Sequence, residues 1–141
     1  MIARLKQQHE DLQALTARLD AIVRAPSLDR QPLAQLRLEM SSLLREHLAL
    51  EEQLIYAPLR THPEAGAEMR RSDDDLRERR MTYSAHVSSW TPDRIVADWS
   101  QYRREVTALT RGLVTRIAYE NDVLYPLFHR LFPQSRRAAA G

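Results

Sequence analysis

Apolar side chains recur every three or four residues along most of this chain, and this spacing limits the folds that it can adopt. In the first segment the spacing passes through a set of six positions with one gap, at position 9: Ile2, Leu5, Leu12, Leu15, Leu19 and Ile22. A period near 3.6 puts such side chains on one face of an α-helix, whereas a strand would need strict alternation. The pattern therefore predicts an all-α protein.

Interruptions of the spacing divide the chain into four predicted helices. Pro26 ends the first segment, Pro63 lies in the second break, and Thr91-Pro92 has a capping threonine followed by a proline at the first helical position. We expect helices over residues 1–24, 30–60, 66–90 and 93–131. The length of the last one leaves open a separate turn over residues 92–98.

The whole chain has the length of a single domain. Its 141 residues are enough to enclose an independent core. Because the predicted connections are short, we expect an antiparallel, up-down-up-down four-helix bundle over residues 1–131. The remaining residues, 132–141, are predicted to be a disordered tail.

Several polar side chains occupy positions inside the apolar stripes. His9 fills the gap between Leu5 and Leu12, and His86 is flanked at helical spacing by Tyr83 and Trp90. Two further positions are pairs four residues apart, which places both members on one helix face. These pairs are His47 with Glu51 and Arg116 with Glu120. All four predicted helices thus direct polar or charged groups inward.

An inward set of this kind needs mutual compensation, because burying one unpaired charge costs several kcal/mol. Imidazole nitrogens and carboxylate oxygens that converge in a bundle core are suitable ligands for iron, zinc or manganese. A lone histidine on an apolar face is more often a hydrogen-bonded core residue, so recurrence of the pattern supports the metal hypothesis. The candidate ligands are His9, His47, Glu51, His86 and Glu120.

The recurrence amounts to an internal repeat. The segment His47-Leu-Ala-Leu-Glu51-Glu-Gln-Leu-Ile-Tyr56 aligns with Arg116-Ile-Ala-Tyr-Glu120-Asn-Asp-Val-Leu-Tyr125. Each copy has glutamate at the fifth position, tyrosine at the tenth and a proline just beyond. Two related helix pairs would place both glutamates opposite each other at the centre. The tyrosines are then candidates for hydrogen bonds to the ligands, with helix packing as the alternative role, especially for Tyr119.

Composition excludes several other kinds of site and partner. The chain has no cysteine, so disulfides, iron–sulfur clusters and thiol catalysis are excluded. A net charge of +2, from 21 basic and 19 acidic residues interleaved along the chain, gives no reason to expect nucleic acid or a membrane surface as partner. With no signal peptide or membrane span in sight, we expect a cytoplasmic protein. The sequence does not indicate its protein partners.

The ordered set of motifs resembles the hemerythrin-like, or HHE cation-binding, domain family. The matching residues are His9-Glu10, His47-x-x-x-Glu51 with Tyr56-Ala-Pro58, His86, and Glu120 with Leu124-Tyr125-Pro126, over roughly residues 1–131. The resemblance implies a four-helix bundle with a non-haem di-iron centre. It also implies that His9, His47 and His86 are terminal ligands and that Glu51 and Glu120 are bridging carboxylates.

Arg116 departs from the family pattern, which has histidine at this position. A guanidinium stays protonated and cannot donate a lone pair to a metal. One interpretation is that Arg116 replaces one metal ion and leaves a mononuclear site of His9, His47, His86 and one carboxylate. Another is that its long stem carries the charge away, so that a two-metal centre keeps one open or water-filled position.

These interpretations lead to three hypotheses about function. The first is a non-haem iron protein, with one or two ions, that binds or senses a small oxidant such as dioxygen, peroxide or nitric oxide. The second is an iron enzyme that decomposes peroxide at the same site. The third is a metal-free helical interaction module in which Arg116 neutralises Glu51 and Glu120.

Overall fold

The structure, a computed structural model, describes residues 2–135, which are almost entirely helical and include no strand. The elements in chain order are α1 (Ile2–Arg24), α2 (Arg30–Glu51), η1 (Glu52–Tyr56), α3 (Ala57–Thr61), η2 (Pro63–Ala65), α4 (Gly66–Ser89), α5 (Pro92–Ala97), α6 (Trp99–Tyr119), η3 (Glu120–Leu124) and α7 (Tyr125–Leu131). Two of the short elements, η1 and η3, are π-helices, and η2 is a 3₁₀-helix. The all-α prediction is confirmed.

The helix ends fall where the sequence signals predicted them. The first helix ends at Arg24, shortly before Pro26, and α4 begins at Gly66. Thr91 caps α5, because its hydroxyl accepts a hydrogen bond of 3.2 Å from the backbone N–H of Arg94. Pro92 starts α5, which is separate from α6 and gives the extra turn that the sequence left open.

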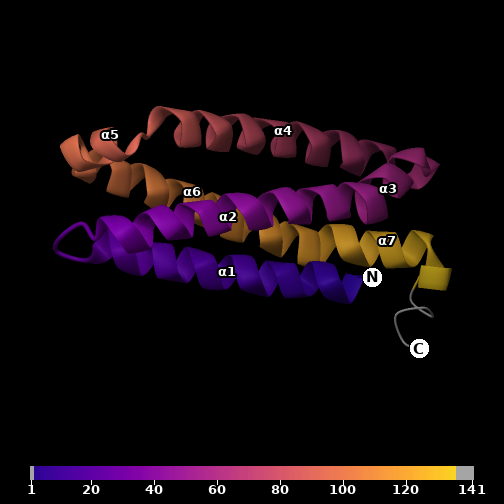
Figure 1. The fold of residues 1–141 in the computed structure, drawn as a ribbon. Coiled ribbons are helices and arrows are strands. Elements are labelled where there is room, and N and C mark those ends of the chain that lie inside the picture. The colour runs from indigo at the N-terminus through magenta and orange to yellow at the C-terminus, as the bar shows by residue number, and fades with distance from the viewer. Residues whose placement is uncertain (1, 136–141) are drawn as a thin grey trace.

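The long helices run alongside one another (Figure 1). The first helix packs against both α2 and α6. Because η1 joins α2 directly to α3, and η3 joins α6 directly to α7, each of these two runs continues as one long helical segment. In Figure 1, α4 lies along the far side from α1, joined to α3 at one end and to α5 at the other.

Three apolar clusters form the core along the length of the molecule. One surrounds Ile55 and Leu124 in the π-helices, and another surrounds Trp90 and Tyr102. The third lies around Leu12. The first helix also has Leu5 in the cluster of the π-helices, so the position between these two leucines, His9, is enclosed by apolar side chains on either side.

The tail predicted at 132–141 lies mostly outside the described residues, which end at 135. Within them, Phe132 and Ser135 are joined by a hydrogen bond of 3.1 Å between the Ser135 N–H and the Phe132 carbonyl. Across residues 2–135, no helix combines the length and apolar character needed to cross a membrane.

Candidate metal centre

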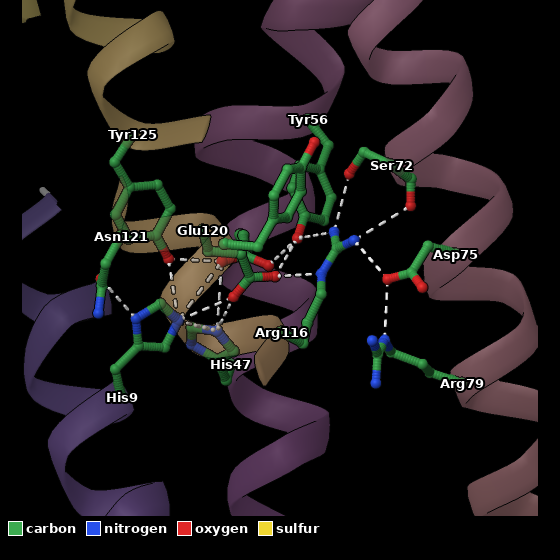
Figure 2. Close-up of polar contacts among 12 residues, drawn as sticks. His9, His47, Tyr56, Ser72, Asp75, Arg79, Arg116, Glu120, Asn121 and Tyr125 are labelled. Carbon is green, nitrogen blue, oxygen red and sulfur yellow. Dashed lines mark hydrogen bonds and ion pairs between the residues drawn. The ribbon is translucent and has the colours of Figure 1, made fainter. Parts of the chain in front are cut away.

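Four of the predicted ligands meet between the helices (Figure 2). His9 comes from α1, His47 and Glu51 lie one turn apart on α2, and Glu120 is the first residue of η3. One nitrogen or oxygen atom from each residue lies within 4.8 Å of the corresponding atoms of the other three. Each of the four residues is at most 3% exposed. This spacing allows a single metal ion to reach all four.

The imidazole rings direct the same nitrogen, Nε2, toward this group. His9 Nε2 lies 2.9 Å from Glu120 Oε1 and 3.1 Å from His47 Nε2. The other ring nitrogens make hydrogen bonds of 2.9 Å, from His9 Nδ1 to the Asn121 amide oxygen and from His47 Nδ1 to that of Gln8. Since an amide oxygen only accepts, each Nδ1 carries a proton, and Nε2 is the nitrogen that can give its lone pair to a metal once the metal displaces any proton there.

Two tyrosine hydroxyls complete the enclosure of the carboxylates. Tyr56 lies within hydrogen-bond distance of both Glu51 and Glu120, with 2.5 Å to Glu120 Oε2. Tyr125 donates to Glu51 Oε2 at 2.5 Å and lies 3.2 Å from His9 Nε2. The predicted role of these two tyrosines agrees with the geometry. Tyr119 instead donates to Glu68, away from the four ligands.

The electrostatics of the group depend on its burial. Burial raises the pKa of Glu51, and the neighbouring Glu120 carboxylate adds to this effect. Burial opposes ionisation of Glu120 as well, but hydrogen bonds from His47 and His9 and the charge of Arg116 hold its pKa well below the usual value. For His47, burial lowers the pKa, but the two glutamates outweigh it and raise it to about 9. The group therefore stabilises positive charge at its centre.

Arg116 closes the side of this group that faces α4. Its Nε donates to Glu120 Oε2 at 2.9 Å, and one terminal nitrogen donates to Asp75 at 3.1 Å and to the Ser72 carbonyl at 3.3 Å. The other terminal nitrogen donates to Tyr56 at 2.9 Å and to the Ser72 hydroxyl at 2.8 Å. All five N–H groups of the guanidinium are thus paired, and the residue is 4% exposed.

The structure does not bring His86 to the other predicted ligands. Its Nδ1 pairs with Glu105 Oε1 at 2.9 Å, and its ring stacks on Tyr102. Burial lowers the pKa of His86, while Glu105 opposes this effect. On α4 the residue that reaches the level of the ligand group is Ser72, about four helical turns before His86.

The two π-helices explain how the tyrosines reach the carboxylates. In a regular α-helix a residue five positions along points about 140° away from the first. Tyr56 follows Glu51 by five positions and Tyr125 follows Glu120 by five, yet all four side chains share the buried group. A π-helix widens the turn, and such turns are frequent at functional sites. Proline follows each one, at Pro58 and Pro126, and cannot donate to the ladder.

Sequence reasoning missed the two amide side chains that orient the imidazoles. Gln8 and Asn121 contact the rings of His47 and His9, respectively, from neighbouring helices. The available signal was weak: each amide residue directly adjoins a different ligand from the one it orients, Gln8 next to His9 and Asn121 next to Glu120. Asp75 and Ser72 were also missed as partners of Arg116.

Fold and site together define a class: an all-helical protein with a buried histidine–carboxylate group suited to a metal ion. Over residues 1–128 the chain matches the family model of the hemerythrin HHE cation-binding domain, and it therefore belongs to that family. No curated protein and no solved structure gives a significant match to the chain.

Proposed function

We propose that this protein binds a single non-haem iron ion through His9, His47, Glu51 and Glu120, and that it binds or senses a small oxidant there. The observation that carries the proposal is the pair of imidazoles, with both Nε2 atoms directed at two buried carboxylates and both Nδ1 atoms held by amide oxygens. This orientation makes Nε2 the nitrogen of each ring that faces the carboxylates and can bind a metal. An antiparallel four-helix bundle is the arrangement that supports such a site.

The donor set fits a divalent metal ion. Two neutral imidazoles and two carboxylates suit iron, and also zinc or manganese. A four-residue set leaves coordination positions on iron that a small ligand such as dioxygen, peroxide or nitric oxide can take. The charges of both glutamates, which are buried, would be offset by the ion.

The position of Arg116 favours one ion over two. Its Nε donates to Glu120 Oε2 at 2.9 Å, so this carboxylate oxygen is already paired with a cation. A fixed positive charge at this distance disfavours a second dication. We therefore propose that Arg116 takes the place of a second metal ion and its histidine ligand.

The test is to measure iron in protein reconstituted with Fe(II) under anaerobic conditions. We expect about one iron ion per chain for the unmodified protein, as a four-donor site implies, and almost none for His47→Ala. The matched control is His86→Ala, which removes a buried histidine outside the ligand group and leaves iron binding intact. Equal iron in all three proteins, with the helical circular dichroism preserved, would contradict the proposal.

A second candidate is a metal-free interaction module, favoured by the complete pairing of Arg116 with Glu120, Asp75 and their neighbours. In that case Fe(II), Zn(II) and Mn(II) each leave the melting temperature unchanged. If one of them binds the native state only, the melting temperature rises with its concentration.

Peroxide decomposition is a further activity that an iron-loaded site could support. Oxygen evolution from peroxide by the reconstituted protein, compared with His47→Ala, measures it directly. Absence of evolution removes this activity but leaves reversible binding in place.

A further inference from the structure

Helix α4 lies against the other helices but leaves a cavity between itself and them. Between Ser72 and His86 it has no fully buried side chain, and of its apolar residues there only Leu76 and Tyr83 are half-buried. Beneath this stretch lies a partly open cavity of about 850 Å³ with walls from α1, α2, α4 and α6. Buried and half-buried apolar residues from the facing helices line it, among them Met40, Leu44 and Leu113.

The size of this α4 cavity indicates an organic molecule. Binding sites for small organic ligands span about 300–1,000 Å³ and are lined mainly by apolar side chains. A water molecule takes about 30 Å³, and apolar walls give water few partners. The cavity is therefore much larger than a diatomic gas requires. An organic ligand would displace water that makes few hydrogen bonds there and would gain apolar contacts with the walls.

The charges on the walls indicate that this ligand is neutral. Among the described lining residues, the buried cation Arg116 is paired with Glu120 and Asp75. At the other end His86 is paired with Glu105, and Arg79 is bound to Asp75 and to the Gly112 carbonyl. The remaining charged lining residues, Arg45, Glu78 and Arg80, are exposed to solvent. An ionised headgroup inside the cavity would lose water and find the buried partners already taken, which is costly.

We propose that the α4 cavity binds a neutral, largely apolar organic molecule between α4 and the facing helices. His47 and Glu120 also line the cavity, so the bound molecule lies beside the ligand group. The proposal goes beyond the proposed function and stands whether or not the site holds a metal ion, because the apolar walls supply the contacts.

The probe is N-phenyl-1-naphthylamine, a neutral apolar fluorophore, titrated into the full chain with and without a chelator. We expect saturable binding of about one probe per chain, with a blue shift that signals apolar surroundings. Leu113→Trp fills the cavity and should weaken binding at least about tenfold. The matched control is Val114→Trp, since Val114 is the next residue, is 43% exposed and lies outside the cavity lining.

A second wall variant, Leu44→Trp, keeps the test decisive if the first fails to fold. If the cavity is empty space, the new tryptophan keeps or raises the melting temperature, whereas a tryptophan forced into a packed core lowers it. The proposal is wrong if the unmodified protein shows no saturable binding, or if a folded wall variant binds as well as Val114→Trp. It is also wrong if both wall variants unfold while Val114→Trp is stable. Iron content is measured separately, so failure here leaves the proposed metal site untouched.

Discussion

The two halves of the molecule use the same backbone device to hold different chemistry. In each half a long helix passes into a π-helix next to a buried glutamate, Glu51 or Glu120, and a tyrosine five residues later reaches the shared group. The first half adds two imidazoles, His9 and His47. Among its described residues, the second half adds a guanidinium, Arg116, in the position that corresponds to His47.

This difference shows that the repeat specifies geometry and that one side chain specifies its use. Both copies place a polar group at the same level along the helix axes and direct it into the same core, because the helix and its π turn are alike. Imidazole at that position offers a nitrogen that can bind a metal, while guanidinium gives a permanent counter-charge for a carboxylate. Substitutions that change one half and leave the other intact test this division.

The largest effect on stability is expected from removing the counter-charge of the second half. Arg116→Ala leaves the buried Glu120 without its guanidinium, and breaking a buried ion pair in this way costs about 3–5 kcal/mol. Urea denaturation of the metal-free protein measures it. The control is Arg18→Ala, because Arg18 and Glu39 form an exposed pair worth about 0–1 kcal/mol. Similar losses in both variants would show that Arg116 is not needed to balance the site.

Making the halves alike should change the metal content. Arg116→His replaces the guanidinium by an imidazole that can donate to a metal, and we expect iron to rise from about one toward about two ions per chain. Metal analysis after reconstitution is the measurement. If the ratio stays the same in a folded variant, the guanidinium is not what limits the second ion.

The orientation of the first-half imidazoles can be weakened without removing a ligand. Gln8→Ala deletes the amide oxygen that holds His47 Nδ1 at 2.9 Å, and losing such a partner reduces metal affinity about 10–100-fold. Asn121→Ala does the same for His9. Competition with a metal-binding dye determines both affinities. The control is Gln7→Ala, because Gln7 is exposed and its amide donates a hydrogen bond to the exposed Asp11.

The two tyrosines should differ in their contributions to stability. Tyr56→Phe leaves a buried N–H of Arg116 without its acceptor. Since an unsatisfied buried donor costs about 1–3 kcal/mol, we expect the free energy of unfolding to fall by an amount near the upper end of this range. Tyr125→Phe removes a hydroxyl that, among residues 2–135, makes hydrogen bonds to Glu51 and His9, and the resulting loss of stability should be smaller. Thermal or urea unfolding compares them. The reverse order would show that the Arg116 contact does not stabilise the site.

The smallest effect concerns His86 and pH. Since burial lowers its pKa in the folded state, the unfolded chain binds the proton more readily, and the protein loses stability as pH falls below about 6.5. The free energy of unfolding of His86→Gln, measured relative to that of the unmodified protein, should therefore increase as the pH is lowered from 7.5 to 5.5. A stability difference that stays constant over this range would contradict the lowered pKa.

Much of the fold and of the ligand group follows from the sequence because both depend on local signals. Helix ends are marked by proline and by a capping threonine, as at Thr91-Pro92, and those residues act within one turn. His47 and Glu51 were brought together by their spacing of four. His9 and Glu120 joined them because each occupies a gap in an apolar stripe.

The sequence placed His86 with the other ligands because periodicity predicts which face of a helix a residue lies on, but not its level relative to residues on other helices. This level depends on how far α4 is shifted along its axis relative to α6. That shift depends on the break between α3 and α4 and on packing across the molecule. The π-helices were missed for a related reason, although there was a signal. Tyr56 and Tyr125 lie nine residues after His47 and Arg116, half a turn off in a regular α-helix, and yet they belong to the repeat.

The π turns also determine where this chain tolerates changes in length. Each one contains a residue more than a regular α-helix needs, so deleting one residue from Glu52–Tyr56 or from Glu120–Leu124 would regularise the helix. Because the π turn absorbs this extra residue, the helix after the deletion would keep its orientation about the axis, and in the second half Phe128 would stay in the core. An alignment with a relative that lacks these turns should therefore place a single-residue gap beside each buried glutamate.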